Sequence, residues 1–338
     1  MPSNGGSTIA VLLPEKTRKQ MLTSESEAAL ATLGTIRNPE NSEIRPDEIP
    51  DLLHGATACL TGWGTPHLDD EVLIGCPELK LVAHTAGSIR RLISQTSLER
   101  GTRVTHAAHV IAQPVAEMVV SQALLCIRRL DKVDQAMKSG SAWLDIRSTY
   151  GGARLLRDRV IGVVGAGMVG SAVIRLFTAF GAKVVVYDPL LTAARATDLG
   201  VASVSLHEVF GQADIVSIHV PVLPATTGMI DETCLSLLRD GSVFINTARA
   251  AVIDYRALYA HLHARRIIGA LDVFPDEPLP LDDAIRNLPD VLLSPHMGGM
   301  TVDSHQEQGE AMVGELSDFF AGKPLRHEIM PEAYPTIA

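Results

Sequence analysis

The stretch that decides the fold is Val160-Ile161-Gly162-Val163-Val164-Gly165-Ala166-Gly167-Met168-Val169-Gly170. Its apolar first half predicts a strand buried on both faces, and the stretch Ser171–Phe180 predicts a helix. In the G-x-G-x-x-G between them, the first glycine permits a tight turn, the second lets the backbone approach a pyrophosphate, and the third permits close helix–strand packing. The helix N-terminus would present unpaired N–H groups to the phosphates. Strand, glycine loop and helix in this order predict a dinucleotide-binding α/β domain.

An acidic residue follows at the position that such a domain requires. The next predicted strand, Lys183–Asp188, ends in a carboxylate that can accept hydrogen bonds from both ribose hydroxyls and would repel a 2′-phosphate. Pro189 and Leu190 follow, with no adjacent Arg or Lys, so the sequence predicts NAD in preference to NADP. The alternative is a glycine turn in a domain that binds no cofactor, which strand, helix and acid in register disfavour.

Short apolar runs alternate with helical stretches along the chain in two series. The first series comprises Thr8–Leu13, Leu33–Arg37, Thr57–Leu60, Leu79–His84 and Arg103–Thr105, and the second comprises Val160–Gly165, Lys183–Asp188, Ile215–His219, Ser242–Asn246, Ile268–Val273 and Val291–Ser294. Strands that alternate with helices indicate βαβ units and doubly wound parallel sheets. For 338 residues two domains are the natural expectation.

The segments around the two series suggest where the domains divide. Pro114–Leu130 is apolar and helix-like, with a proline that suits the first helical turn, and is predicted to be a buried connector. Lys138–Arg159 has the character of a long loop. Ser304–Phe320 predicts a helix beyond the last strand, which suggests that the C-terminus returns to the first domain. We therefore expect a discontinuous substrate domain, residues 1–120 and 301–338, and a nucleotide-binding domain, residues 121–300.

Composition excludes several classes of protein. The net charge of −10 and the lack of a Lys/Arg run disfavour binding to nucleic acid or to anionic membranes. No uncharged apolar run approaches the ~20 residues of a membrane span, and Met1–Ser7 lacks the features of a signal peptide. The scattered cysteines contain no C-x-x-C and indicate a reducing compartment, the cytoplasm. The pairs His106/His109 and His261/His263 lack nearby ligands at metal spacing, so no metal site is expected.

Three segments that follow predicted strands of the second series supply Arg249, Glu277 and His296. They lie where open α/β sheets bind ligands. Arginine binds a carboxylate through a planar fork, histidine donates a proton to a developing oxyanion, and a carboxylate beside the histidine favours its charged form. Singly, these residues are more often a surface ion pair, a loop cap and a structural histidine. Together, beside a dinucleotide fingerprint, they indicate hydride transfer to a small 2-keto acid.

At this point the chain resembles the D-isomer-specific 2-hydroxyacid dehydrogenases. The resemblance covers nearly the whole chain and rests on residues 165–170, Asp188, His219-Val220-Pro221 with Thr226, Asn246-Thr247-Ala248-Arg249, Asp272 with Glu277, and Ser294-Pro295-His296. It implies a flavodoxin-like substrate domain and a Rossmann NAD-binding domain with the active site in the cleft between them. It also implies a homodimer, formed through the region that contains Trp143 and Tyr150.

The resemblance also implies roles for single residues. Arg249 would bind the substrate's carboxylate and carbonyl oxygen, His296 would be the acid–base, and Glu277 would hold and charge His296. Asp272 would contact the nicotinamide amide, and His219, Val220, Pro221 and Thr226 would lie along the adenosine half. The cofactor contacts would further include Gly165 to Gly170, Asp188, Thr247, Ala248 and Gly298. Ala86, Gly87 and Ser88 resemble the family's substrate loop, whose backbone N–H groups take the carboxylate.

Some features depart from the family's pattern, and two other functions stay open. Ala250 stands where glycine is usual, and the loop Thr61–Pro66 is distinctive, with Trp63 either lining the substrate cleft or packing between the domains. A binding protein that senses NAD(H), like the C-terminal-binding-protein co-repressors, is one alternative. Oxidation of another small anion such as phosphite is the second; formate dehydrogenases use Gln where this chain has Glu277. The sequence leaves the particular 2-hydroxy acid open.

Overall fold

The computed structural model describes residues 6–337, which divide into two compact units. Unit 1 contains the described residues up to 111 and those from 300 onward, and unit 2 contains residues 112–299. The sequence analysis placed these divisions after residues 120 and 300. Of Met1–Ser7, where a signal peptide was not expected, the first five residues lie outside the described part of the chain.

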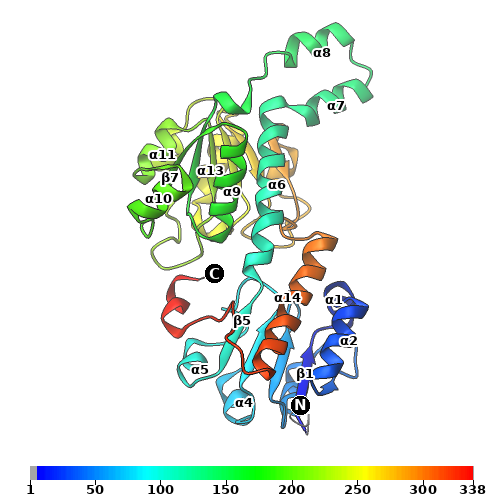
Figure 1. The fold of residues 1–338 in the computed structure, drawn as a ribbon. Helices are drawn as coiled ribbons and strands as arrows, with labels where there is room; N and C mark the ends of the chain where they lie inside the picture. The colour runs from blue at the N-terminus through cyan, green and yellow to red at the C-terminus, as the bar shows by residue number, and fades with distance from the viewer. Residues whose placement is uncertain (1–5, 338) are drawn as a thin grey trace. The chain divides into compact units, whose positions relative to one another are not determined.

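Unit 1 is built on a parallel five-stranded sheet with the order β2-β1-β3-β4-β5. The strands are β1 (Thr8–Leu12), β2 (Thr35–Arg37), β3 (Ala58–Thr61), β4 (Leu81–His84) and β5 (Arg103–His106). The helices are α1 (Glu15–Met21), α2 (Ser24–Leu33), α3 (Ile49–Leu53), α4 (Asp70–Ile74), α5 (Gln95–Glu99) and α14 (Val302–Phe320) (Figure 1). This order is that of flavodoxin-like folds.

Successive side chains of a strand point to opposite faces of this sheet, and helices cover both faces. In β1, Ile9 and Val11 pack with α1, α2 and α14, whereas Ala10 and Leu12 pack with α3 and α5. All four side chains are fully buried, as a parallel sheet with helices on both faces requires.

Unit 2 is built on a parallel seven-stranded sheet with the order β12-β11-β10-β9-β6-β7-β8. The strands are β6 (Val160–Val164), β7 (Lys183–Tyr187), β8 (Ala202–Ser203), β9 (Ile215–Ile218), β10 (Val243–Asn246), β11 (Ile268–Leu271) and β12 (Val291–Leu293). The helices are α6 (Ala108–Arg128), whose first turn belongs to unit 1, α7 (Leu130–Lys138), α8 (Trp143–Tyr150), α9 (Met168–Ala179), α10 (Ala193–Leu199), α11 (Leu206–Gln212), α12 (Glu232–Leu237) and α13 (Tyr255–His263). Counted from β6, the order is that of a Rossmann fold with one added strand.

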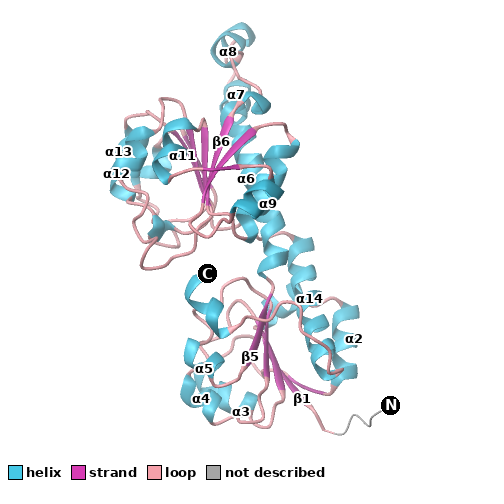
Figure 2. Ribbon diagram, turned by 60° about the vertical axis from the view of Figure 1, so that its left-hand side comes forward, coloured by secondary structure: helices cyan, strands magenta, loops and turns pink. Residues whose placement is uncertain are grey.

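Helices cover both faces of the second sheet. Side chains of α11, α12 and α13 pack on one face around Phe210, Leu235 and Leu258. Side chains of α6 and α9 pack on the other around Val119 and Phe177. Figure 2 shows α11, α12 and α13 on one side of this sheet and α6 and α9 on the other. The predicted fold class, two doubly wound parallel-sheet units with one of Rossmann type, is confirmed.

Three local predictions were wrong. Helix α6 begins at Ala108, so Pro114 lies inside the helix and not in its first turn. The proline removes one helical hydrogen bond there, which the packing of the buried helix outweighs. Residues 138–159, predicted to be a loop, contain helix α8. The short exposed strand β8 was missed because Ala202 and Ser203 carry no apolar pattern.

Helix α6 also bears on the membrane prediction. Among residues 6–337 it is the one helix that is long and apolar enough to cross a membrane by length and composition. The sequence analysis had asked for an uncharged run, and Glu117 interrupts this one. Ala116, Val119 and Ala123 of α6 are fully buried in the core of unit 2, as in the core helix of a globular domain.

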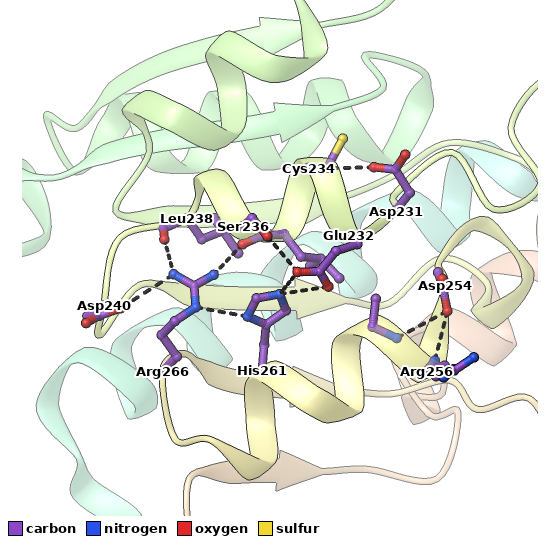
Figure 3. Close-up of polar contacts among 12 residues, drawn as sticks. Asp231, Glu232, Cys234, Ser236, Leu238, Asp240, Asp254, Arg256, His261 and Arg266 are labelled. Atoms are coloured by element: carbon purple, nitrogen blue, oxygen red, sulfur yellow. Dashed lines mark hydrogen bonds and ion pairs between the residues drawn. The ribbon is translucent and has the colours of Figure 1, made fainter.

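A polar network around Arg266, which lies between α13 and β11, connects α12 and α13 (Figure 3). Arg266 donates to the carbonyls of Leu235 and Leu238 at the end of α12, and its Nε donates to His261 Nδ1 at 2.9 Å. Because Nδ1 accepts, the proton of a neutral His261 is on Nε2, which lies 3.2 Å from the Glu232 carboxylate. Both ring nitrogens therefore serve the structure of the domain.

Candidate active site

The glycine loop between β6 and α9 has the geometry that a dinucleotide needs. Gly165 has φ +97°, and a Cβ on Gly170 would lie 1.9 Å from the Gly165 carbonyl oxygen. A Cβ on Gly167, by contrast, would meet no atom within 4 Å. The loop is thus closed on its inner side and open at Gly167, directly before Met168 and Val169 at the start of the twelve-residue helix α9. An anion can approach these first N–H groups of the helix.

Asp188 holds this loop in place. Its Oδ2 accepts a hydrogen bond from the Ala166 amide at 2.7 Å, and its Oδ1 accepts one from the Leu190 amide at 2.8 Å. The sequence analysis missed a second polar residue beside the loop: Arg195, on α10, donates to the Ala166 carbonyl and to the Ser171 hydroxyl. It had looked for a basic residue only next to Asp188, whereas the turn into α10 brings Arg195 to the loop.

Two buried polar atoms among the predicted cofactor contacts lack a hydrogen-bond partner in the described chain. They are Nδ1 of His219, after β9, and the hydroxyl of Thr247, after β10. Burial lowers the pKa of His219 to about 3, so the ring is neutral, and its Nε2 lies 2.8 Å from the Ser217 hydroxyl. Because buried polar groups are normally paired, these atoms fit a bound polar ligand. The residues present therefore fit a dinucleotide.

The residues after His219 that were predicted to contact the cofactor interact mainly with nearby parts of the chain. Val220 is buried in the core. The Thr226 hydroxyl donates to the Pro221 carbonyl at 2.5 Å and accepts from the Leu223 amide at 2.8 Å, and so closes the loop after β9.

The turn after β10 presents Arg249. Fully buried Asn246 accepts from the Ala248 amide at 3.0 Å and donates to the Arg249 carbonyl at 3.2 Å, which fixes the turn. Arg249 has extended backbone and an exposed side chain, whose Nη1 donates to the Ala248 carbonyl. Ala250 begins a 3-10 turn in a conformation that needs no glycine, so this departure from the family pattern carries no backbone strain.

His296 and Glu277 form the pair that the sequence suggested. His296 Nδ1 donates to Glu277 Oε2 at 2.7 Å, which leaves Nε2 for another partner. Burial raises the pKa of Glu277, but hydrogen bonds from His296 and the Phe274 amide, with the charges of His296 and Arg249, outweigh burial and hold the pKa below its ordinary value. Both side chains are partly exposed and therefore accessible to a ligand.

The backbone of His296 is unusual, and Asp272 supports it. His296 has φ +50°, an uncommon conformation for a residue with a side chain and one that tends to occur at functional sites. Its amide donates to the Asp272 carbonyl at 2.8 Å. The buried Asp272 carboxylate accepts from the Ser294 hydroxyl and from the amides of Met297 and Gly298. The three groups that donate to this carboxylate thus all lie in the loop that carries His296.

A pocket of about 610 Å³ adjoins the pair within unit 2. Glu277, His296 and Arg286 provide its charged and polar lining, with Phe274 and Leu279 among its apolar residues. Arg286 is fixed there because it donates to the carbonyls of Leu279 and Pro280.

In unit 1 the predicted substrate loop follows β4. Ala86 is buried, and Gly87 and Ser88 are partly exposed. The Thr85 amide donates to the Thr61 carbonyl at 2.7 Å, but the hydrogen bonds of the described chain include none from the amides of Ala86, Gly87 or Ser88. Successive unpaired N–H groups of this kind can bind an anion.

The distinctive loop after β3 lies beside this one. The Thr85 hydroxyl also donates to the Thr61 carbonyl, and a Cβ on Gly62 would lie 2.3 Å from the Thr85 hydroxyl oxygen. Within unit 1, Trp63 packs edge-on against His305 of α14, with ring centroids 5.3 Å apart. Trp63 is therefore anchored inside its own unit.

Comparison with known proteins gives the context for this geometry. Residues 120–298 match the NAD binding domain of the D-isomer specific 2-hydroxyacid dehydrogenases. The chain belongs to this family. It is 31% identical over 267 residues to the D-3-phosphoglycerate dehydrogenase of Mycobacterium bovis, which covers 79% of this chain and 49% of the relative. The chain thus spans about half the length of the first curated relatives that it matches.

Other relatives of the family are nearer to this chain in length. The hydroxypyruvate reductase of Thermotoga maritima is 31% identical over 280 residues, which cover 82% of this chain and 89% of the relative. The crystal structure of a phosphoglycerate oxidoreductase from Rhizobium etli superposes with a TM-score of 0.78 at 27% identity, over 95% of this chain and 97% of that one.

Membership in this dehydrogenase family assigns unit 2 as its NAD-binding domain. Within residues 6–337 no group of three or more His, Cys, Asp or Glu side chains could hold a metal ion. His109, one of the histidines weighed as a ligand, instead stacks on His327, with ring centroids 3.5 Å apart.

Proposed function

We propose that this protein is an NAD-dependent oxidoreductase that interconverts a small 2-keto acid and its D-2-hydroxy acid. The observation that carries the proposal is the 2.7 Å pair of His296 and Glu277 in the unit that holds the glycine loop. A histidine whose Nδ1 is held by a carboxylate can present the proton on Nε2 to a substrate.

When bound, NADH supplies the hydride that reduces the substrate carbonyl. In that direction Arg249 binds the carboxylate and the carbonyl oxygen of the keto acid, and its charge stabilises the developing alkoxide. His296, charged and paired with Glu277, gives its Nε2 proton to that alkoxide. Asp272 keeps the loop of His296 in position through the amides of Met297 and Gly298.

The N–H groups of residues 86–88 are proposed to bind the same carboxylate. Their amides form no other hydrogen bond in the described chain, which supports this role. Backbone donors bind a carboxylate without a second positive charge.

Glyoxylate and hydroxypyruvate are the first candidate substrates, because relatives at 31% identity are named glyoxylate reductase and hydroxypyruvate reductase. Both are small 2-keto acids whose carboxylate and carbonyl fit the donors proposed above.

The test is NADH oxidation at 340 nm against a panel of 2-keto acids, with formate and phosphite assayed in the direction of NAD reduction. We expect at least one keto acid to turn over, and His296→Ala to abolish turnover while the dissociation constant of NADH stays within about twofold. Turnover of phosphite alone, or NADH binding with no turnover of any compound, would replace this proposal with one of its two rivals.

We further propose a homodimer formed through the segment α7–α8. This segment extends away from the sheet of unit 2 in both views (Figures 1 and 2). No residue of α7 is buried, and Trp143 and Leu144 of α8 are 62% and 74% exposed. Apolar side chains on a projecting arm fit a second copy of the chain. Light scattering should give twice the chain mass, and Leu144→Glu should reduce it; a monomeric mass for the unaltered protein refutes the dimer.

We propose a cytoplasmic location on the ground that Cys59, Cys76, Cys126 and Cys234 are free and buried, as in a reducing compartment. Oxidised thiols in protein isolated under non-reducing conditions would contradict this.

A further inference from the structure

Two successive carbonyl groups of the substrate loop accept hydrogen bonds from the same side. The Ala86 carbonyl accepts from the Ala107 amide at 3.1 Å. The Gly87 carbonyl lies 2.8 Å from Nδ1 of His106, and since a carbonyl can only accept, the ring must donate. Both donors lie at the end of β5, the strand next to β4. Two successive carbonyls of the loop, those of Ala86 and Gly87, are thus held by one backbone amide and one imidazole from the end of β5.

The geometry of the peptide bond links each held carbonyl to the direction of the N–H group in the same peptide. In a trans peptide the C=O and the N–H point in opposite directions. Holding the Ala86 carbonyl therefore directs the Gly87 N–H away from β5, and holding the Gly87 carbonyl directs the Ser88 N–H in the same way.

We propose that His106 is a positioning residue that, with the Ala107 amide, holds residues 87 and 88 in the one orientation in which their amides bind the substrate's carboxylate. The inference rests on the proposed function, which places the carboxylate at residues 86–88. His106 does not touch substrate and acts through the loop.

The imidazole of His106 serves as an uncharged donor. Burial lowers the pKa of His106, so at neutral pH the ring carries one proton, and the contact with the Gly87 carbonyl places that proton on Nδ1. The amides alone then supply the attraction for the carboxylate.

The test compares His106→Leu with His106→Asn. Leucine removes the donor, whereas the side-chain amide of asparagine can place an N–H where Nδ1 of histidine is. His54 of the same unit has an exposed side chain, so His54→Asn is the matched control. The readouts are the dissociation constant of oxalate on the enzyme–NADH complex by calorimetry, and KM and kcat for the keto acid that the unaltered enzyme reduces.

We expect His106→Leu to raise both the oxalate dissociation constant and KM about tenfold or more, as for a lost buried hydrogen bond, with kcat and the NADH dissociation constant nearly unchanged. His106→Asn should restore oxalate binding to within about threefold of the unaltered enzyme. An unchanged melting temperature and circular dichroism spectrum show that each variant is folded, because His106 lies in unit 1 and NADH binding reports on unit 2.

Two outcomes overturn the positioning role of His106 while the proposed function stands: an unaltered oxalate dissociation constant in His106→Leu, or equal weakening by leucine and asparagine, which would mean that the ring only fills space. Failure of the proposed function appears in the unaltered enzyme itself, as no oxalate binding and no keto acid turnover, and it overturns the positioning role as well.

Discussion

The molecule contains two loops suited to binding anions through backbone amides, and they reach that state by different means. The loop of residues 165–170 in unit 2 is shaped by its own glycines and by the helix that it begins. The loop of residues 86–88 in unit 1 contains one glycine, and two of its carbonyls accept hydrogen bonds from the side chain of His106 and the backbone amide of Ala107. The conformation of the first loop is determined by consecutive residues, whereas that of the second depends on tertiary contacts.

This difference predicts how each loop fails. A loop shaped by glycine fails when a Cβ is added, whatever the side chain. A loop held by an imidazole fails when the donor is removed and recovers when another donor replaces it.

The largest effect is expected for Gly170→Ala. Its Cβ would lie 1.9 Å from the Gly165 carbonyl oxygen, so helix and loop must separate, which should lower the melting temperature and abolish NADH binding. Gly167→Ala is the matched control, because its Cβ meets no protein atom within 4 Å. It should keep the melting temperature and still weaken NADH binding about tenfold, because the methyl group occupies the path of the pyrophosphate. Equal NADH affinity in Gly167→Ala and the unaltered protein would contradict this role of the loop.

Arg249→Lys should come next, with a loss of about 100-fold in kcat/KM, since an ammonium cannot reproduce a bidentate fork. The turn itself is fixed by Asn246 and should not change. Steady-state kinetics with unchanged NADH affinity would place the loss at the substrate. A loss below threefold would mean that Arg249 does not bind the carboxylate.

The pH dependence of Glu277→Gln gives a smaller but specific effect. The pKa of Glu277 lies below its ordinary value, so its charge is present at neutral pH and is lost only as the pH falls through that lowered value. In the unaltered enzyme kcat/KM for the keto acid should therefore decline as the pH falls through the lowered pKa of Glu277, because the protonated carboxyl no longer pairs with His296 as an anion. Glu277→Gln has no group that titrates there, so its kcat/KM should be lower at neutral pH and show no such decline. Superimposable rate–pH profiles for Glu277→Gln and the unaltered enzyme would remove Glu277 from the mechanism.

The smallest effect is expected at Asp188. Removing its charge in Asp188→Asn should improve kcat/KM for NADPH relative to NADH by about tenfold, the size of a single charge repulsion near the surface. Arg195 lies at the same loop through Ala166 and would then favour the added phosphate. Equal use of NADPH and NADH by the unaltered enzyme would refute the argument from Asp188.

The sequence predicted those parts of the protein that rest on local pattern. Eleven apolar runs were predicted as strands, and each overlaps one in the structure, because strands buried on both faces need continuous apolar side chains. The pair of His296 and Glu277 was also predictable, since each follows a strand of one parallel sheet and such ends gather at one edge.

What the sequence could not reveal depends on register and on side chains that meet only after folding. His106 reaches Gly87 because β4 and β5 pair in parallel, with His84 opposite His106. Arg195 reaches Ala166 because α10 turns back toward the glycine loop. The sequence showed His106 only as one of a spaced pair with His109, which was weighed as a metal site and not as a support for the substrate loop.

The most direct test of the central claim is the configuration of the product. The unaltered enzyme is supplied with NADH and hydroxypyruvate, or with pyruvate if that is reduced faster, and the product is resolved by chiral chromatography. The account predicts a single D-2-hydroxy acid, formed in amounts equal to the NADH consumed and absent with His296→Ala. An L or racemic product, or undiminished formation with His296→Ala, would contradict it.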